Sequence, residues 1–104
     1  MKKYDAIIIG AGHNGLTNAT YLAKAGLNTL VIEKNDYIGG AAVTRELHEG
    51  WFYSNCSYVC SMMRQSIHRD LNLTKHGLIL VPYLGTVTFG DSGDTISAYH
   101  SEGP

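Results

Sequence analysis

The sequence predicts an α/β fold built on two parallel strands that a helix connects. Residues 4–9 form a short apolar run, and the glycine-rich stretch G-A-G-H-N-G at residues 10–15 follows it directly. A helix-like pattern comes next, and a second apolar run ends at Glu33, about twenty residues beyond the glycines. Strand, glycine loop, helix, strand and acid follow one another as in a Rossmann-like βαβ unit, which binds a dinucleotide at its glycine loop.

The first strand and the helix are predicted from their apolar patterns. Residues 4–9 are rich in β-branched side chains and nearly all apolar, which is typical of a buried parallel strand. Over residues 14–25, small and apolar side chains recur at intervals of three and four residues, as on one face of a helix: Leu16, Ala19, Leu22 and Ala23. Gly26 is expected to end this helix in the left-handed conformation.

The second strand is predicted over residues 28–33, whose centre reads T-L-V-I. Because a helical crossover separates it from the first strand, the two strands must pair in parallel. A dinucleotide-binding sheet normally has five or six strands, and only two of the parallel type can be recognised in this chain. We therefore expect an incomplete domain, the N-terminal part of a larger enzyme.

Beyond Glu33 the pattern is looser, and the expected elements rest on turn residues and short apolar runs. The first of them are a turn at 34–37, a short helix or an extended loop at 43–48, a turn at Gly50 and a strand at 51–53. A helix within 61–76, which Gly77 caps, and a strand at 78–81 follow. The last is a β-hairpin that joins 86–89 to 95–99 through D-S-G-D.

The composition excludes several classes of partner. The 104 residues are 44% hydrophobic and 16% charged, with a formal net charge of −1, so nothing favours a nucleic acid or an anionic membrane surface. No apolar run reaches the roughly eighteen residues of a transmembrane helix, and the N-terminus lacks the core of a signal peptide. We expect a soluble, intracellular, cytoplasmic protein whose partner is a small molecule.

The glycines of the 10–15 loop have separate expected tasks. Gly10 allows the tight turn out of the strand, Gly12 lets the backbone approach a pyrophosphate, and Gly15 permits close packing of helix on strand. Free N–H groups at the helix N-terminus suit the phosphates. The alternative is a glycine-rich turn that binds no ligand. His13 lies within the loop, so proximity to a ligand follows from its position, whereas a catalytic role does not.

The carboxylate of Glu33 is the expected acceptor for the adenosine ribose hydroxyls, and its charge would repel the 2′-phosphate of NADP. A solvated strand-end carboxylate is the alternative, and Lys34 beside it is explained equally well as a surface residue. The glycine pair Gly39-Gly40 lets the backbone approach a neighbour closely. This second pair suits a cofactor longer than one mononucleotide, although a plain loop explains it as well.

The two cysteines, Cys56 and Cys60, predict neither a metal site nor a redox disulfide. A zinc site would need two further ligands, and the histidines show no ligand-like spacing. Ordinary buried or half-buried thiols are favoured instead. No pairing of a nucleophile with a base identifies a catalytic residue, and the remaining histidines are interpreted as surface or capping residues: His48, His68, His76 and His100.

Three segments together resemble the start of an FAD-dependent oxidoreductase related to phytoene desaturase. They are D-A-I-I-I-G-A-G-H-N-G-L at 5–16, L-V-I-E-K at 30–34 and I-G-G-A-A-V-T at 38–44. Within that superfamily the chain resembles the branch of pyridine-nucleotide-disulfide-oxidoreductase-domain proteins. The segments C-S-Y-V at 56–59 and H-G-L at 76–78 are also similar to that branch.

The resemblance implies an FAD-binding domain of the glutathione-reductase type, with residues 1–81 as its N-terminal part and residues 82–104 as the start of a β-rich substrate domain. Such enzymes pass hydride equivalents from C–C or C–N bonds to FAD. The expected partner is a small-molecule substrate, with an apolar one among the candidates, and this chain alone would be inactive. The implied cofactor-binding residues are Gly10, Ala11, Gly12, His13, Asn14, Gly15, Glu33, Lys34, Gly40, Ala41 and Ala42.

Two departures from the family pattern and two alternatives accompany this interpretation. Many relatives place an arginine directly after the glycine pair, whereas this chain has Ala41 there and Arg45 four residues on. The cysteines come too late in the chain to match the redox pair of the disulfide reductases. One alternative is an NAD-binding dehydrogenase domain. The other is a cofactor-free, non-enzymatic protein of the same fold, like the GDP-dissociation inhibitors.

Overall fold

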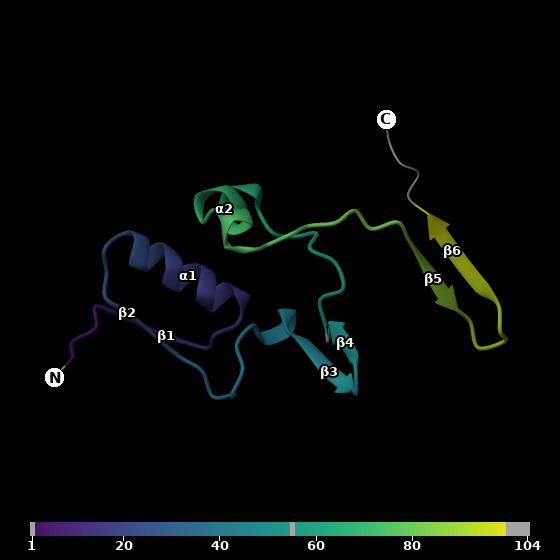
Figure 1. Ribbon diagram of the computed structural model, residues 1–104, viewed down its shortest axis with the longest axis horizontal. Helices are drawn as coiled ribbons and strands as arrows, with labels where there is room; N and C mark the ends of the chain where they lie inside the picture. Colours follow the sequence, from purple (N-terminus) through teal and green to yellow (C-terminus); the bar gives the residue numbers. More distant parts are fainter. Residues whose placement is uncertain (1, 55, 100–104) are drawn as a thin grey trace.

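Two parallel strands and the helix between them form the N-terminal unit of the computed structural model, which describes residues 2–54 and 56–99. Strand β1 (Ala6–Ile9) pairs with β2 (Thr29–Ile32) in register from Ala6 opposite Thr29 to Ile9 opposite Ile32. Helix α1 (His13–Lys24) connects them (Figure 1). The predicted βαβ order and the parallel pairing are therefore confirmed.

Helix α1 covers one face of this small sheet. A Cβ atom at Gly15 would lie 3.4 Å from Cγ2 of Ile8, and Ala19 on the helix is buried. Ile7 and Ile9 point to the opposite face and are 57% and 87% exposed. Alternation along β1 thus separates a helix-covered face from a bare one. Gly26 follows the helix with φ +89°, the left-handed conformation that the sequence predicts.

Residues 44–54 form an antiparallel hairpin. Strand β3 (Thr44–His48) pairs with β4 (Trp51–Ser54), with an irregularity between Glu46 and His48, and Gly50 turns the chain at φ +77°. The predicted turn at Gly50 and the strand that follows it are confirmed. The segment 43–48, for which a helix and an extended loop were both open, is a strand. Neither segment has the periodicity of a helix, and pairing with β4 selects the extended conformation.

The predicted helix within 61–76 is two short helices. Helix α2 (Gln65–Asp70) and the 3₁₀ helix η2 (Leu73–His76) are separated at Asn72, whose φ of +53° interrupts the α conformation. Gly77 caps the second helix at φ +96°, as predicted. The two-helix segment contacts α1 through Asp70, which accepts hydrogen bonds from the Tyr21 hydroxyl at 3.0 Å and from the Lys24 ammonium group.

The predicted strand at 78–81 is wrong, whereas the predicted hairpin after it is confirmed. Among the described residues, the segment 78–81 has no ladder partner, and a strand requires one. Strand β5 (Gly85–Phe89) pairs antiparallel with β6 (Thr95–Tyr99). The last five residues of the predicted substrate-domain segment, 100–104, lie outside the described residues.

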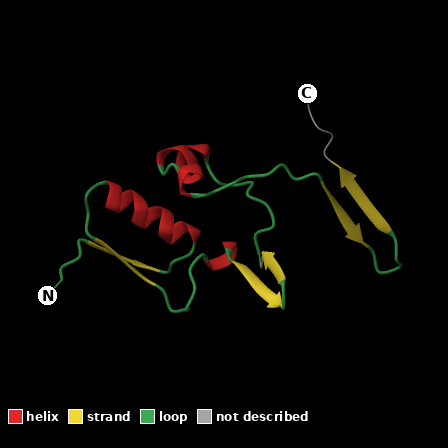
Figure 2. Ribbon diagram, viewed as in Figure 1, coloured by secondary structure: helices red, strands yellow, loops and turns green. Residues whose placement is uncertain are grey.

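The chain is extended, with the β5–β6 hairpin well apart from the βαβ unit (Figure 2). Its radius of gyration is 18.3 Å, whereas about 13 Å is expected for a compact chain of this length. In the part of the chain that the structure describes, the buried apolar side chains are only Ala11, Ala19 and Leu71. No helix in that part is long and apolar enough to cross a membrane.

Candidate nucleotide-binding site

The glycine loop turns sharply from β1 into α1, and two of its glycines are required by the fold itself. Gly10 has φ +100°, and its N–H donates to the Ile32 carbonyl at 2.7 Å. A Cβ atom at Gly15 would lie 2.1 Å from the Gly10 carbonyl oxygen. A side chain at residue 10 would be strained by the backbone conformation, and one at residue 15 would collide with the turn.

Gly12 differs from these two glycines because the fold does not require it. Its φ of −75° and ψ of 173° are open to any residue, and a Cβ atom there would make only an ordinary contact, 3.8 Å from Cα of Gly40. A glycine that neither the backbone conformation nor the packing requires leaves the backbone at the start of the helix without a side chain to cover it. That is the condition for close approach by a ligand.

The N-terminus of α1 offers donors to an anion. In this helix, which the structure describes in full, the first turn carries no acidic residue, and no side chain caps the helix at its N-cap residue, Gly12. Leu16 donates its N–H to the Gly12 carbonyl at 2.9 Å, so the three preceding N–H groups have no helical acceptor. His13 and Asn14, at the start of the helix, are exposed. Free N–H groups and the positive end of the helix dipole favour a phosphate here.

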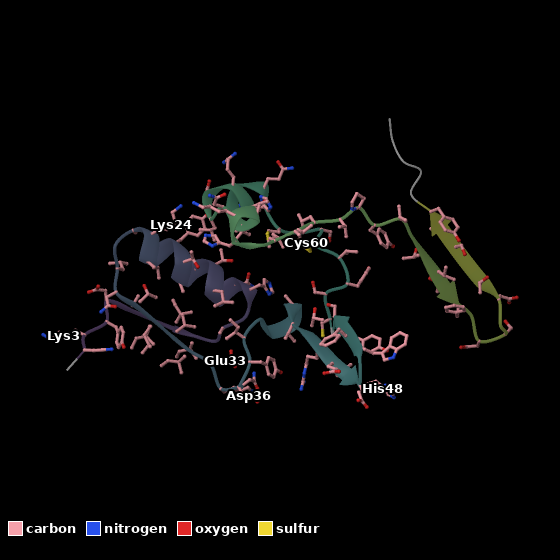
Figure 3. All side chains as sticks on the ribbon, in the orientation of Figure 1. Lys3, Lys24, Glu33, Asp36, His48 and Cys60 are labelled. Carbon is pink, nitrogen blue, oxygen red and sulfur yellow. The ribbon has the colours of Figure 1, made fainter. Side chains whose placement is uncertain are left out.

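The carboxylate of Glu33 reaches back to the glycine loop. Its Oε2 accepts the Ala11 N–H at 2.7 Å, and its Oε1 accepts the backbone N–H and the Nδ2 amide of Asn35 at 3.0 and 2.9 Å. Hydrogen bonds from the Asn35 backbone and then from Ala11 lower the pKa of Glu33, so the side chain is ionised at neutral pH. Figure 3 shows Glu33 in the turn after β2, near Asp36.

Sequence reasoning missed both partners of Glu33. It assigned the carboxylate to the ribose hydroxyls alone and did not consider the Ala11 N–H or Asn35. A signal for Asn35 was present, because a short amide side chain two residues after a strand-end acid readily bonds to its neighbours in a turn. The Ala11 contact had no comparable signal, since it joins residues 22 positions apart.

The second glycine pair packs directly on the first glycine loop. Gly39 has φ +116° and donates its N–H to the Ala11 carbonyl at 2.8 Å, next to a β-bridge between Gly12 and Gly39. A Cβ atom at Gly40 would lie 3.0 Å from Cα of Gly12. Two segments far apart in sequence therefore meet backbone to backbone. The 3₁₀ helix η1 (Gly40–Ala42), which contains Ala41, starts at this contact.

Arg45, four residues after Ala41, contacts an aromatic side chain. Arg45 lies on β3 with its guanidinium carbon 5.0 Å from the centre of the Tyr37 ring. This cation–π contact ties the β3–β4 hairpin to the turn that carries Glu33 and Asn35. Lys34, in the same turn, is exposed.

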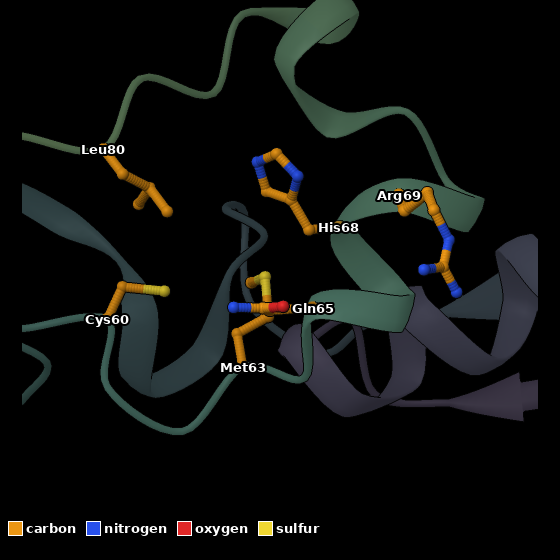
Figure 4. A pocket seen from close by; sticks show the side chains of 6 residues that line it. All are labelled: Cys60, Met63, Gln65, His68, Arg69 and Leu80. Carbon is orange, nitrogen blue, oxygen red and sulfur yellow. The ribbon is translucent and has the colours of Figure 1, made fainter.

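A cavity lies away from the glycine loop. This cavity of about 400 Å³ is lined by Cys60, Met63, Gln65, His68, Arg69 and Leu80 (Figure 4). Both cysteines are exposed free thiols, which corrects the expectation of buried or half-buried ones. Within residues 2–54 and 56–99, no three His, Cys, Asp or Glu side chains are grouped to hold a metal ion.

The fold and the site together define a nucleotide-binding βαβ unit of the Rossmann type. Residues 8–71 match the family model described as "NAD(P)-binding Rossmann-like domain". The chain belongs to this family, and the predicted Rossmann-like fold is confirmed.

Similar proteins support the sequence-based resemblance. "Pyridine nucleotide-disulfide oxidoreductase domain-containing protein 2" of Rattus norvegicus is 54% identical over 75% of this chain and 13% of its own length. "Phytoene desaturase" of Neurospora crassa is 34% identical over 88% of this chain and 12% of its own length. A "CLA-producing fatty acid isomerase from P. acnes" has a similar structure, with a TM-score of 0.68 and 25% identity over 92% of this chain and 22% of its own. The chain thus spans only a small part of the length of each of these relatives. Their similarity confirms the predicted family resemblance.

Proposed function

We propose that this chain is the nucleotide-binding portion of an FAD-dependent oxidoreductase that removes hydride equivalents from a small, apolar substrate. The observation that carries the proposal is Gly12, a glycine that the fold does not need, at the N-terminus of a helix without a cap or an acidic first turn. The family match and the names of the relatives point to the same class of protein.

In this proposal the chain's own residues bind and orient the cofactor. The bare backbone at Gly12 and the first N–H groups of α1 hold the pyrophosphate. The Glu33 carboxylate accepts a hydrogen bond from a ribose hydroxyl, and its negative charge disfavours the extra 2′-phosphate of NADP. When bound, FAD supplies the hydride acceptor. Gly40 and Ala41 lie on the segment that packs against Gly12, which suits contact with the pyrophosphate or with the part of FAD beyond it.

The choice of FAD over NAD rests on the family resemblance and the second glycine pair. An NAD-binding dehydrogenase domain would use the same glycine loop and the same acid, so the two cofactors are compared directly. The full-length protein is purified and its visible spectrum recorded, and its thermal stability is then measured with added FAD or NAD. We expect flavin absorbance and protection by FAD. Protection by NAD alone favours the dehydrogenase alternative, and no response to either cofactor overturns the proposal.

The residue-level test exploits the fact that the fold tolerates a side chain at residue 12. Gly12→Ala should lower the affinity for FAD by at least about tenfold, because a methyl group would stand where the pyrophosphate approaches. Its circular dichroism spectrum should stay that of the wild type. Gly90→Ala is the matched control, since a Cβ there lies no closer than 3.5 Å to its neighbours, in the β5–β6 hairpin. Equal FAD affinity in Gly12→Ala and the control would contradict the assignment.

A further inference from the structure

Glu33 has three of its acceptor positions occupied within the chain. A carboxylate offers about four lone-pair positions, two on each oxygen. Asn35 fills both positions on Oε1 with its backbone N–H and its Nδ2 amide, whereas Oε2 accepts the Ala11 N–H. Among the residues that the structure describes, Oε2 thus keeps more acceptor capacity than Oε1, and it is the oxygen that bonds to the glycine loop.

This asymmetry comes from Asn35. The Ala11 N–H holds Oε2, and the Asn35 backbone N–H holds Oε1 with a single hydrogen bond. The second donor, Nδ2 at 2.9 Å, bonds to the same oxygen and strengthens the hold of Asn35 on Oε1. The remaining lone pair of Oε2 is then directed beside the Ala11 N–H, at the edge of the phosphate loop.

We propose that Asn35 is a positioning residue of the nucleotide site, which holds Glu33 so that Oε2 accepts one ribose hydroxyl of the bound cofactor while it also binds the phosphate loop. This inference rests on the proposed nucleotide-binding function. It assigns a role to a residue that does not itself touch the ligand. It also makes Glu33 a link between the two halves of the site, ribose and pyrophosphate.

Other charged or titratable side chains lie on the segments that meet here and bear on the test. They are Lys34, Asp36 and Tyr37 in the same turn, His13 at the start of α1 and Arg45 on β3. The pKa of Glu33 is lowered mainly by the backbone N–H groups of Asn35 and Ala11, and the Asn35 amide adds a smaller effect in the same direction. Because the wild type and the variants share every other group, the ratio of their affinities isolates the effect of residue 35.

The test measures the affinity of the full-length protein for FAD between pH 8 and pH 5, after removal and rebinding of the cofactor. Asn35→Ala should weaken binding about tenfold, by a factor that stays nearly constant between pH 8 and pH 5, because the amide donor is lost while the backbone N–H groups of Asn35 and Ala11 still lower the pKa of Glu33. Asn35→Asp should weaken binding roughly a hundredfold at pH 7.5, because two carboxylates then face each other. Its affinity should recover as the pH falls and a shared proton restores a donor.

The recovery of Asn35→Asp at low pH, set against the nearly constant loss in Asn35→Ala, separates positioning from a structural role. If Asn35 merely shaped the turn, both variants would lose affinity by a factor that does not depend on pH. Asn18→Asp, on the exposed side of α1, is the charge-matched control and should follow the wild type. Should Asn35→Ala fail to fold, Asn35→Ser, which keeps a short donor, should retain most of the affinity. Wild-type protein that binds neither FAD nor NAD overturns the proposed function, whereas a wild type that binds alongside unaffected Asn35 variants overturns only this inference.

Discussion

The βαβ unit and the β5–β6 hairpin are held together in different ways. In the βαβ unit, contacts join segments distant in sequence, such as the Gly10 N–H to the Ile32 carbonyl and the Asn28 N–H to the Asp5 carboxylate at 2.8 Å. The hairpin pairs only with itself among the described residues, and Phe89 is 77% exposed. The candidate site lies where these long-range backbone contacts converge, so substitutions there should affect more of the fold than substitutions in the hairpin.

The largest effect is expected from a substitution at Gly15. A Cβ atom at this residue would lie 2.1 Å from the Gly10 carbonyl oxygen, so Gly15→Ala must push α1 away from β1. We expect a loss of about 3 kcal/mol in the free energy of unfolding. Gly90→Ala, in the turn of the hairpin, should change it by less than about 0.5 kcal/mol. Urea denaturation of both variants measures the difference, and similar losses of unfolding free energy would contradict the expected difference between the two regions.

A smaller effect is expected from Glu33→Gln, and it should depend on pH. The pKa of Glu33 is lowered in the folded protein, so its contribution to stability is present above its unfolded pKa, about 4.3, and is lost as the pH falls through the folded value. The melting temperature of Glu33→Gln should lie below that of the wild type at pH 7, and the two should converge as the pH falls below the lowered pKa of Glu33. A constant difference over this range would show that the carboxylate charge is not what matters.

The smallest effect is expected where the β3–β4 hairpin is tied to the βαβ unit. Arg45→Gln removes the cation–π contact with Tyr37 and should lower the free energy of unfolding by about 0.5–1 kcal/mol. Arg64→Gln, which changes another arginine at the start of α2, is the matched control and should have almost no effect. Equal values for the two variants, measured by thermal denaturation, would indicate that the contact contributes nothing to stability.

Much of the fold could be predicted because its signals are local. The run before Gly10, the small-residue face of α1 and the turn around Gly93 each specify their own element. The failures occurred where a partner decides the conformation. Residues 43–48 become a strand through β4, and residues 78–81 remain irregular without a partner among the described residues. The helix predicted within 61–76 is interrupted at Asn72, which the apolar pattern alone does not reveal.

In the candidate site, the glycine loop, the strand-end acid and the second glycine pair could be recognised from the residues alone, because steric limits on turns and the periodicity of strands and helices are local properties. The contact of Glu33 with the Ala11 N–H, the packing of Gly39 and Gly40 on the loop, and the freedom of Gly12 from any demand of the fold arise only in the folded chain. These facts depend on the parallel pairing of β1 with β2. That pairing brings residues 22 positions apart within hydrogen-bonding distance.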